Sequence, residues 1–230
     1  MIKYFEGTVF NTGCDAIVNT INCVGVMGAG IALEFSLRYP DMYKDYVEKC
    51  KKNEVHVGEV YIYRTREQTI INFPTKWHFK YPSQLEWIEQ GLKDFLKKHK
   101  TYGIKSIAFP KLGTLNGGLD WLTVKKIMEK HLSNLDIEVV ICLDTLNEAQ
   151  GLEKRMLDYF NGHYKEVLEE IPKMKNVQVQ NIQDNIPFKR FWQIAKTPKI
   201  GATTYSKIYN KCKDSVENGD ISQTTLFELL

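Results

Sequence analysis

The feature that most constrains the fold is a buried-strand pattern that runs directly into a glycine-rich loop and a helix. Residues 15–22 read DAIVNTIN, an apolar run that places Asn19 and Asn22 near its end, and residues 25–32 read GVMGAGIA. Backbone N–H groups of such a loop can close on phosphate oxygens, and the positive end of the following helix favours the same charge. The spacing is neither the dinucleotide fingerprint nor the P-loop. The unit predicts a diphosphate site, although any tight strand-to-helix turn also uses glycines.

Two further segments carry the same kind of signal. Residues 109–121 read FPKLGTLNGGLDW, again a strand end, a glycine loop and a helix start, and residues 72–79 read NFPTKWHF. Together with the first loop, the second loop resembles the macrodomain family, whose members bind ADP-ribose. The third segment narrows the resemblance to the branch that holds the DarG antitoxins and the terminal ADP-ribose glycohydrolases. The resemblance covers residues 1 to about 145.

Strand and helix patterns alternate through the same residues, which predicts helices on both faces of a largely buried sheet. Apolar runs bounded by turn residues predict strands at 2–10, 16–21, 60–63, 70–73, 104–109 and 137–143. Helical spacing occurs at 30–38, 41–51 and 122–132, and another helix is predicted to start at Ser83 with Glu86 completing a capping box. With the resemblance, this predicts a three-layer α/β/α macrodomain with a mixed central sheet over residues 1–145.

Composition sets further limits. At 230 residues and 43% hydrophobic, the chain can build one sizeable core plus an appendage. Its five cysteines show no C-x-x-C spacing and its five histidines are isolated, which favours reduced thiols and predicts no metal site. No cofactor is expected. The first residues lack a signal-peptide pattern and no stretch reaches membrane-span length, so we expect a soluble, cytoplasmic protein with no membrane partner.

Residues 146–230 differ in character and predict a small, mostly helical, basic region. Positions 173 to 213 hold nine Lys or Arg against one acid, Asp184, a net charge of +8 that leaves −5 for the rest of the chain. Basic charge mixed with aromatic rings is typical of a surface that binds nucleic-acid strands. The alternative is a helical bundle with an aromatic core and solvated lysines. The rings concerned are Phe188, Phe191, Trp192, Tyr205 and Tyr209.

The resemblance implies roles for individual side chains. It makes Lys76 a nucleophile that attacks the anomeric carbon of the distal ribose, and burial would lower the pKa of its amine and free it for this step. Asn22 would position the distal ribose. Asp120 is a candidate acid or base, with a helix N-cap as the rival role. Asn19 is either structural or in contact with the proximal ribose.

The adenine end departs from the family pattern. Many macrodomains have an aspartate after the glycine that follows the first strand, and Thr8 stands there in this chain. Threonine lacks the charge, so Asp144 and backbone groups are the alternatives for holding the base. The ADP-ribose contacts that the resemblance implies are Thr8, Val9, Asn19, Asn22, Gly28, Gly30, Ile31, Thr75, Gly113, Thr114, Asn116, Gly117, Gly118, Leu119 and Asp144.

The resulting hypothesis is a DNA ADP-ribosyl glycohydrolase of antitoxin type that acts on single-stranded DNA. Alternatives are hydrolysis of protein-linked ADP-ribose or of ADP-ribose phosphate, and a non-catalytic ADP-ribose reader. A cognate ADP-ribosyltransferase toxin is an expected partner, although residues 146–230 are shorter than a full toxin-binding region. After a run at 214–220 that is expected to be disordered, Gln223–Phe227 (QTTLF) resembles the peptide that docks on the bacterial sliding clamp. A final helix packed on the domain is the rival interpretation.

Overall fold

The computed structural model describes the backbone of residues 1–227 and the side chains of residues 1–219. The chain divides into two compact units, Met1–Thr145 and Leu146–Leu230. Within the described residues, no helix has both the length and the apolar composition that crossing a membrane requires.

Unit Met1–Thr145 is built on one mixed sheet of six strands in the order β1-β6-β5-β2-β4-β3. Every neighbouring pair is parallel except β3 and β4, which are antiparallel. The mixed sheet is therefore confirmed. The strands are β1 (Ile2–Phe5), β2 (Ala16–Ile21), β3 (Tyr61–Arg64), β4 (Thr69–Pro74), β5 (Ser106–Phe109) and β6 (Glu138–Cys142).

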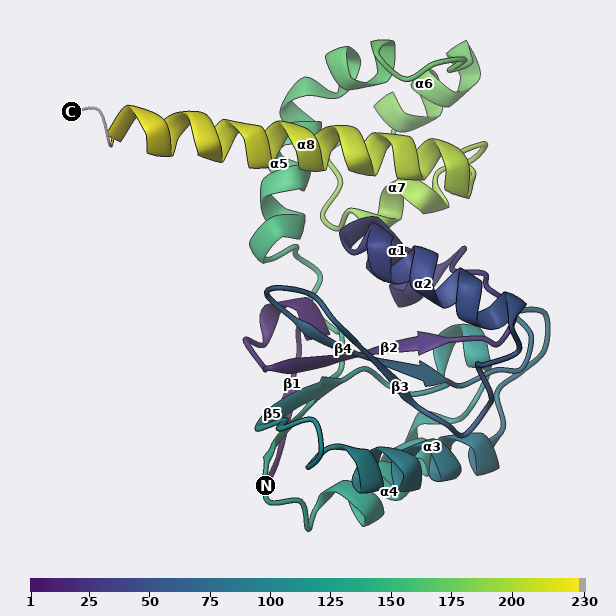
Figure 1. Ribbon diagram of the computed structural model, residues 1–230. Helices are drawn as coiled ribbons and strands as arrows, with labels where there is room; N and C mark the ends of the chain where they lie inside the picture. The colour runs from purple at the N-terminus through teal and green to yellow at the C-terminus, as the bar shows by residue number, and fades with distance from the viewer. Residues whose placement is uncertain (228–230) are drawn as a thin grey trace. The chain divides into compact units, whose positions relative to one another are not determined.

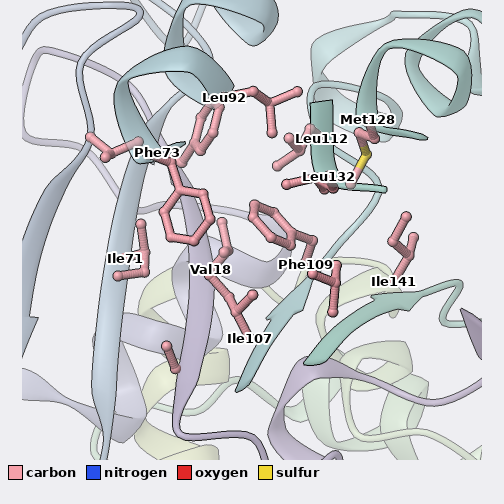
Figure 2. Close-up of a cluster of buried hydrophobic side chains, with 14 of the residues drawn as sticks. Val18, Ile71, Phe73, Leu92, Ile107, Phe109, Leu112, Met128, Leu132 and Ile141 are labelled. Atoms are coloured by element: carbon pink, nitrogen blue, oxygen red, sulfur yellow. The ribbon is translucent and has the colours of Figure 1, made fainter. Parts of the chain in front are cut away.

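Two helix pairs cover the two faces of this sheet (Figure 1). Helices α1 (Gly30–Arg38) and α2 (Pro40–Lys51) lie on one face, and α3 (Leu85–Lys98) and α4 (Trp121–Leu132) lie on the other. Strand residues alternate between the two cores with the period of two that a buried strand requires. On β2, Ile17 packs towards α1 and α2, whereas Val18 packs towards α3 and α4. Figure 2 shows the second of these cores, in which Val18, Ile71, Phe73, Phe109 and Leu92 converge.

Two boundaries differ from those that the sequence predicts. The first strand ends at Phe5 rather than at residue 10, because Val9–Asn11 winds into a short 3-10 helix (η1) that is closed by Asn11 N–H donating to Thr8 O at 3.1 Å. The prediction of a capping box that starts at Ser83 is wrong. Helix α3 has Gln84 at its N-cap, and the backbone N–H of Ser83 donates instead to Gly117 O at 2.9 Å.

Unit Leu146–Leu230 is a helical bundle of α5 (Gly151–Glu169), α6 (Asn176–Gln183), α7 (Trp192–Lys196) and α8 (Ala202–Phe227). The aromatic residues predicted to form a strand-binding surface are mostly its core. Phe188, Phe191, Tyr205 and Tyr209 are buried, and only Trp192 is exposed. The bundle alternative is therefore the correct one for these four rings, since a buried ring offers no face to a base.

The basic stretch is also less uniform than its composition indicates. Arg190 is buried and pairs through Nε with Glu153 Oε1 at 2.9 Å, so it stabilises the bundle. Lys189 and Lys196 are exposed. The run at 214–220, expected to be disordered, continues the backbone of α8 instead. The clamp-like peptide Gln223–Phe227 follows on the same helical backbone, and its side chains lie outside the described residues.

Candidate functional site

Three segments leave neighbouring strands at one edge of the sheet. The first glycine loop (residues 22–29) follows β2, the lysine segment (residues 75–81) follows β4, and the second glycine loop (residues 110–118) follows β5. Because β2 lies between β5 and β4, the carboxyl ends of all three strands are adjacent, which is where ligands bind in open α/β sheets. The backbone joins two of these segments directly, since Cys23 N–H donates to Trp77 O at 3.1 Å.

Asn116 is the point at which the segments meet. Lys76 Nζ donates a short hydrogen bond to the backbone carbonyl of Asn116. A Cβ atom added at Gly30 would lie 2.8 Å from Asn116 Nδ2, and one added at Gly117 would lie 3.9 Å from Lys76 Cε. The glycines at these two positions allow the first glycine loop, the lysine and the second glycine loop to approach one another closely.

The surroundings of Lys76 shift the ionisation of its amine. Partial burial lowers the pKa of Lys76 below its usual value, because desolvation disfavours the charged form. Desolvation is the cause of this shift, and among the described side chains no carboxylate forms an ion pair with Lys76 to oppose it. The nearby thiol of Cys23 is not a rival nucleophile, since burial raises its pKa to about 12 and keeps it protonated.

Asn22 organises the first glycine loop. Its side-chain Oδ1 accepts from Val24 N–H and from the Tyr46 hydroxyl, each at 2.9 Å, and its Nδ2 donates to Val26 O. These bonds fix the turn that leads to α1, and Asn22 remains at the sheet edge. Ala29 at the N-cap of α1 offers no side-chain hydrogen bond, so the first turn of this helix keeps its unpaired N–H groups for an anion.

Asn19 is not brought to the site. Its side chain is fully buried inside β2, and its Nδ2 donates to Asn72 Oδ1 on β4 at 2.8 Å. A side chain without accessible surface does not contact a ligand in this state, so the structure favours the structural reading of Asn19 over a ribose contact.

Asp120 occupies the N-cap of α4. Its Oδ2 accepts from Thr123 N–H at 2.8 Å and from the Thr123 hydroxyl at 2.9 Å. These hydrogen bonds hold the pKa of Asp120 below its usual value, which keeps the carboxylate ionised at neutral pH. The cap role is therefore present in the structure, and Asp120 is unsuited to act as a general acid.

The residues expected to hold adenine lie where β1 and β6 end. Asp144 N–H donates to Gly7 O at 3.2 Å, which brings the exposed Asp144 next to the residue that precedes Thr8. The side chain of Val9 is buried and packs in the core beneath α1 and α2. The remaining predicted contacts lie in or beside the three segments, where Gly28 and Gly118 are exposed, Ile31 and Leu119 are half-buried, and Thr75, Gly113 and Thr114 are buried.

Ser83 belongs to this site and was missed as a site residue by sequence reasoning, which assigned it to a helix cap. The side chain is 4% exposed, and its hydroxyl has no hydrogen-bond partner within the described part of the chain. A Cβ atom added at Gly117 would lie 2.5 Å from Ser83 Oγ, so the hydroxyl faces the second glycine loop beside Lys76. Among the described residues, no cluster of metal-ligating side chains occurs.

Comparison with known proteins identifies the family. Residues 18–128 match the Macro domain family. The solved macrodomain of Mycobacterium tuberculosis DarG superposes on this chain with a TM-score of 0.61 at 43% sequence identity, over 62% of this chain and 97% of that one. The chain therefore belongs to the macrodomain family.

Within that family, the relatives indicate the DarG-type branch. The DNA ADP-ribosyl glycohydrolase of Mycobacterium tuberculosis is 43% identical over 146 residues, which cover 61% of this chain and 42% of that protein. A DNA ADP-ribosyl transferase–DNA ADP-ribosyl glycohydrolase fusion protein of Thermosipho africanus is 35% identical over 177 residues, covering 68% of this chain and 44% of the fusion. The chain thus spans less than half the length of these two relatives.

Proposed function

We propose that residues 1–145 bind ADP-ribose at this sheet edge and hydrolyse the bond between its distal ribose and a nucleobase of DNA. The observation that carries the proposal is the position of Lys76, whose Nζ donates to Asn116 O between the two glycine loops and whose pKa is lowered by burial. The similarity to two proteins named as DNA ADP-ribosyl glycohydrolases supports the same reaction.

In the proposed reaction, the neutral amine of Lys76 gives its electron pair to the anomeric carbon of the distal ribose. The bond from that carbon to the base nitrogen breaks, its electron pair leaves with the base, and the base takes up the proton that the alkylated amine of Lys76 releases. Water then displaces the amine from the anomeric carbon. This second step releases ADP-ribose and restores the lysine.

The remaining groups bind and orient. The unpaired N–H groups at the start of α1 face the diphosphate, and the second glycine loop approaches it from β5. Asn22 holds the first glycine loop in shape and so positions the distal ribose through the loop. Thr8 and Asp144 are left for adenine, and Asp120 contributes as an ionised helix cap.

The test of the nucleophile is Lys76→Ala and Lys76→Arg in the full chain, with Lys97→Ala as the control because Lys97 is exposed in the last turn of α3. Both Lys76 variants should lose turnover of an ADP-ribosylated oligonucleotide while keeping ADP-ribose affinity within a few-fold, since a nucleophile acts mainly in the transition state. Opening of the ribose ring converts the lysyl adduct to a Schiff base, and borohydride should reduce it and so trap ADP-ribose on Lys76 of the unaltered protein. A Lys76→Ala variant that keeps most of its rate would falsify the covalent mechanism.

The same assay separates the alternatives. Turnover of ADP-ribosylated protein in preference to the oligonucleotide would favour the protein-linked substrate, and tight ADP-ribose binding without turnover would favour a reader. A DNA ADP-ribosyltransferase is the proposed partner, because a protein similar to this chain is a fusion with one. The exposed Lys189 and Lys196 of the helical bundle are proposed to contact the DNA backbone.

A further inference from the structure

Next to Lys76, the chain exposes three aromatic side chains within five residues. Trp77 is 57% exposed, Tyr81 is 56% exposed and Phe79 is 44% exposed. Contiguous ring surface exposed to water is typical of a site that binds a ligand or a partner. These rings are not part of either core cluster of this unit.

Two of the rings share an orientation. The planes of Trp77 and Tyr81 lie within 15° of each other with their centroids 6.1 Å apart, and we call these two side chains the aromatic platform. His78 and Phe79 form a second stacked pair, with centroids 4.4 Å apart. Near-parallel exposed rings present flat π faces, which is the geometry that nucleobases use when they stack.

The segment that carries the platform is held in place by its own backbone. Trp77 O accepts from Cys23 N–H, Tyr81 N–H donates to His78 O, and Lys80 N–H donates to His78 Nδ1, each at 3.1 Å. Prolines at positions 74 and 82 bound the turn and restrict it further. Little ordering is therefore needed when a ligand stacks on these rings.

The charge of the segment fits a polyanion. Residues 74–83 contain two lysines and one histidine and no acid. Lys80 is exposed and its Nζ lies 5.9 Å from the centroid of the Phe79 ring. Rings interleaved with cations are the combination that binds single strands, because bases stack while phosphates meet positive charge. Residues 173–213 also combine cations with rings in sequence, but four of those five rings are buried.

We propose that the aromatic platform of Trp77 and Tyr81 stacks on unpaired bases of single-stranded nucleic acid and presents the modified nucleotide to Lys76. The biological substrate in this proposal rests on the proposed function. In that function the leaving group of the Lys76 reaction is a base of the same strand that stacks on the platform. It assigns the strand to the rings directly after the nucleophile rather than to aromatic residues of the helical bundle.

The binding test uses the full chain and unmodified oligonucleotides, so it does not depend on hydrolysis. Fluorescence anisotropy compares Trp77→Ala, Tyr81→Ala and Trp77→Phe with Tyr102→Ala, whose ring is 39% exposed in the turn before β5, at the opposite edge of the sheet. The probes are a single strand with bases and an abasic strand of the same length. Each alanine variant of the platform should bind the strand with bases about tenfold more weakly. Trp77→Phe and Tyr102→Ala should bind it as the unaltered protein does.

Binding of the abasic strand should be the same for all variants, because it keeps the phosphates and lacks the stacking partners. In turnover, the alanine variants should lose about tenfold in kcat/KM on an ADP-ribosylated oligonucleotide and keep the rate on an ADP-ribosylated nucleoside. Calorimetry with ADP-ribose and thermal unfolding check that the fold and the sugar site are intact. If Trp77→Ala also lowers the rate on the ADP-ribosylated nucleoside, Tyr81→Ala is the variant that tests the platform, because Tyr81 lies five positions from Lys76.

The outcomes separate this proposal from the proposed function. The platform is overturned if the alanine variants lose affinity equally for the abasic strand and the strand with bases. It is also overturned if neither alanine variant loses affinity while hydrolysis proceeds. If the alanine variants lose turnover of an ADP-ribosylated protein but not of the oligonucleotide, the platform proposal is also overturned, and the rings bind a protein substrate instead. If the protein hydrolyses none of these substrates but its binding of the strand still depends on Trp77 and Tyr81, the platform is supported and the proposed hydrolase function is overturned.

Discussion

The unpaired hydroxyl of Ser83 leads to a prediction of unusual sign. Ser83→Ala should stabilise the ligand-free protein, whereas most substitutions of buried residues destabilise. The side chain is 4% exposed and its Oγ has no partner among the described residues, so folding removes a hydroxyl from water without replacing its hydrogen bond. That desolvation costs about 1–3 kcal/mol, and alanine keeps the Cβ contacts. We expect a gain of about 1 kcal/mol, or roughly 3 °C in Tm for a unit of this size.

Ser106→Ala is the matched control. Ser106 Oγ accepts from Asp15 N–H at 2.8 Å, so its removal loses this exposed hydrogen bond and should lower the free energy of unfolding by about 0.5–1 kcal/mol. Thermal and urea unfolding of the full chain provide the measurement. The transition that ADP-ribose shifts upward is the one that belongs to residues 1–145.

The same variant tests whether ligand satisfies the hydroxyl. Ser83 Oγ faces Gly117 of the second glycine loop, so a ligand held there should pair with it, and Ser83→Ala should weaken ADP-ribose binding about fivefold by calorimetry. A decrease in Tm comparable to that of Ser106→Ala would show that the hydroxyl already has a partner in the free protein. Unchanged affinity would remove Ser83 from the ligand contacts.

Three further predictions test packing, ionisation and charge. Gly91→Ala should cost about 1–3 kcal/mol in urea unfolding, because the new Cβ would lie 2.4 Å from the Phe73 ring, and an unchanged midpoint would contradict this packing. Turnover should rise with pH as Lys76 loses its proton and level off below the usual lysine value of 10.5, so a flat profile would exclude a free amine in the reaction. Lys189→Glu with Lys196→Glu should weaken DNA binding and reduce its salt dependence, by about one power of salt per lost contact on duplex DNA. An unaltered salt slope would mark these lysines as solvated surface.

The local pattern of apolar residues was sufficient to predict most strands of the sheet. It failed where a residue is buried without being part of a strand. The predicted strand at 16–21 matches Ala16–Ile21 because alternate residues pack against two separate cores. The first strand was predicted too long because Val9 is apolar, yet it packs into the core from a 3-10 helix rather than from a strand. An apolar residue shows that a position is buried and leaves its backbone conformation open.

The site could be anticipated in its segments but not in its contacts. Glycines, a lysine and two asparagines can be read from the chain, whereas the approach of Lys76 to Asn116 depends on β2 lying between β4 and β5. That strand order is set by packing between residues that are far apart in the sequence. Ser83 shows the same limit, because its short sequence context fits a helix cap and only the approach of Gly117 places it in the site.

The aromatic rings show why composition alone assigns function poorly. Phe191 and Tyr209 lie in the basic stretch, and they are buried against each other with centroids 5.4 Å apart. Trp77 and Tyr81 lie in a short turn after β4, where two prolines and a strand end leave no helix or strand to bury them. The distinction comes from the backbone that carries each ring.

Several unfavourable features gather where the strands end. Lys76 is partly desolvated without a carboxylate partner, Ser83 has an unpaired hydroxyl, and Trp77 exposes its ring. The Ser83 hydroxyl and the Trp77 ring each lower the stability of the free protein, and under the proposed function each gains a partner once ADP-ribose and a base are bound. Desolvation of Lys76 lowers the pKa of its amine, which the proposed reaction uses. The large core between the sheet and α3 and α4 supplies the stability that tolerates them. This coupling predicts that ligand stabilises residues 1–145 by more than its contacts with the glycine loops alone provide, and Ser83→Ala should reduce that excess while raising the Tm of the free protein.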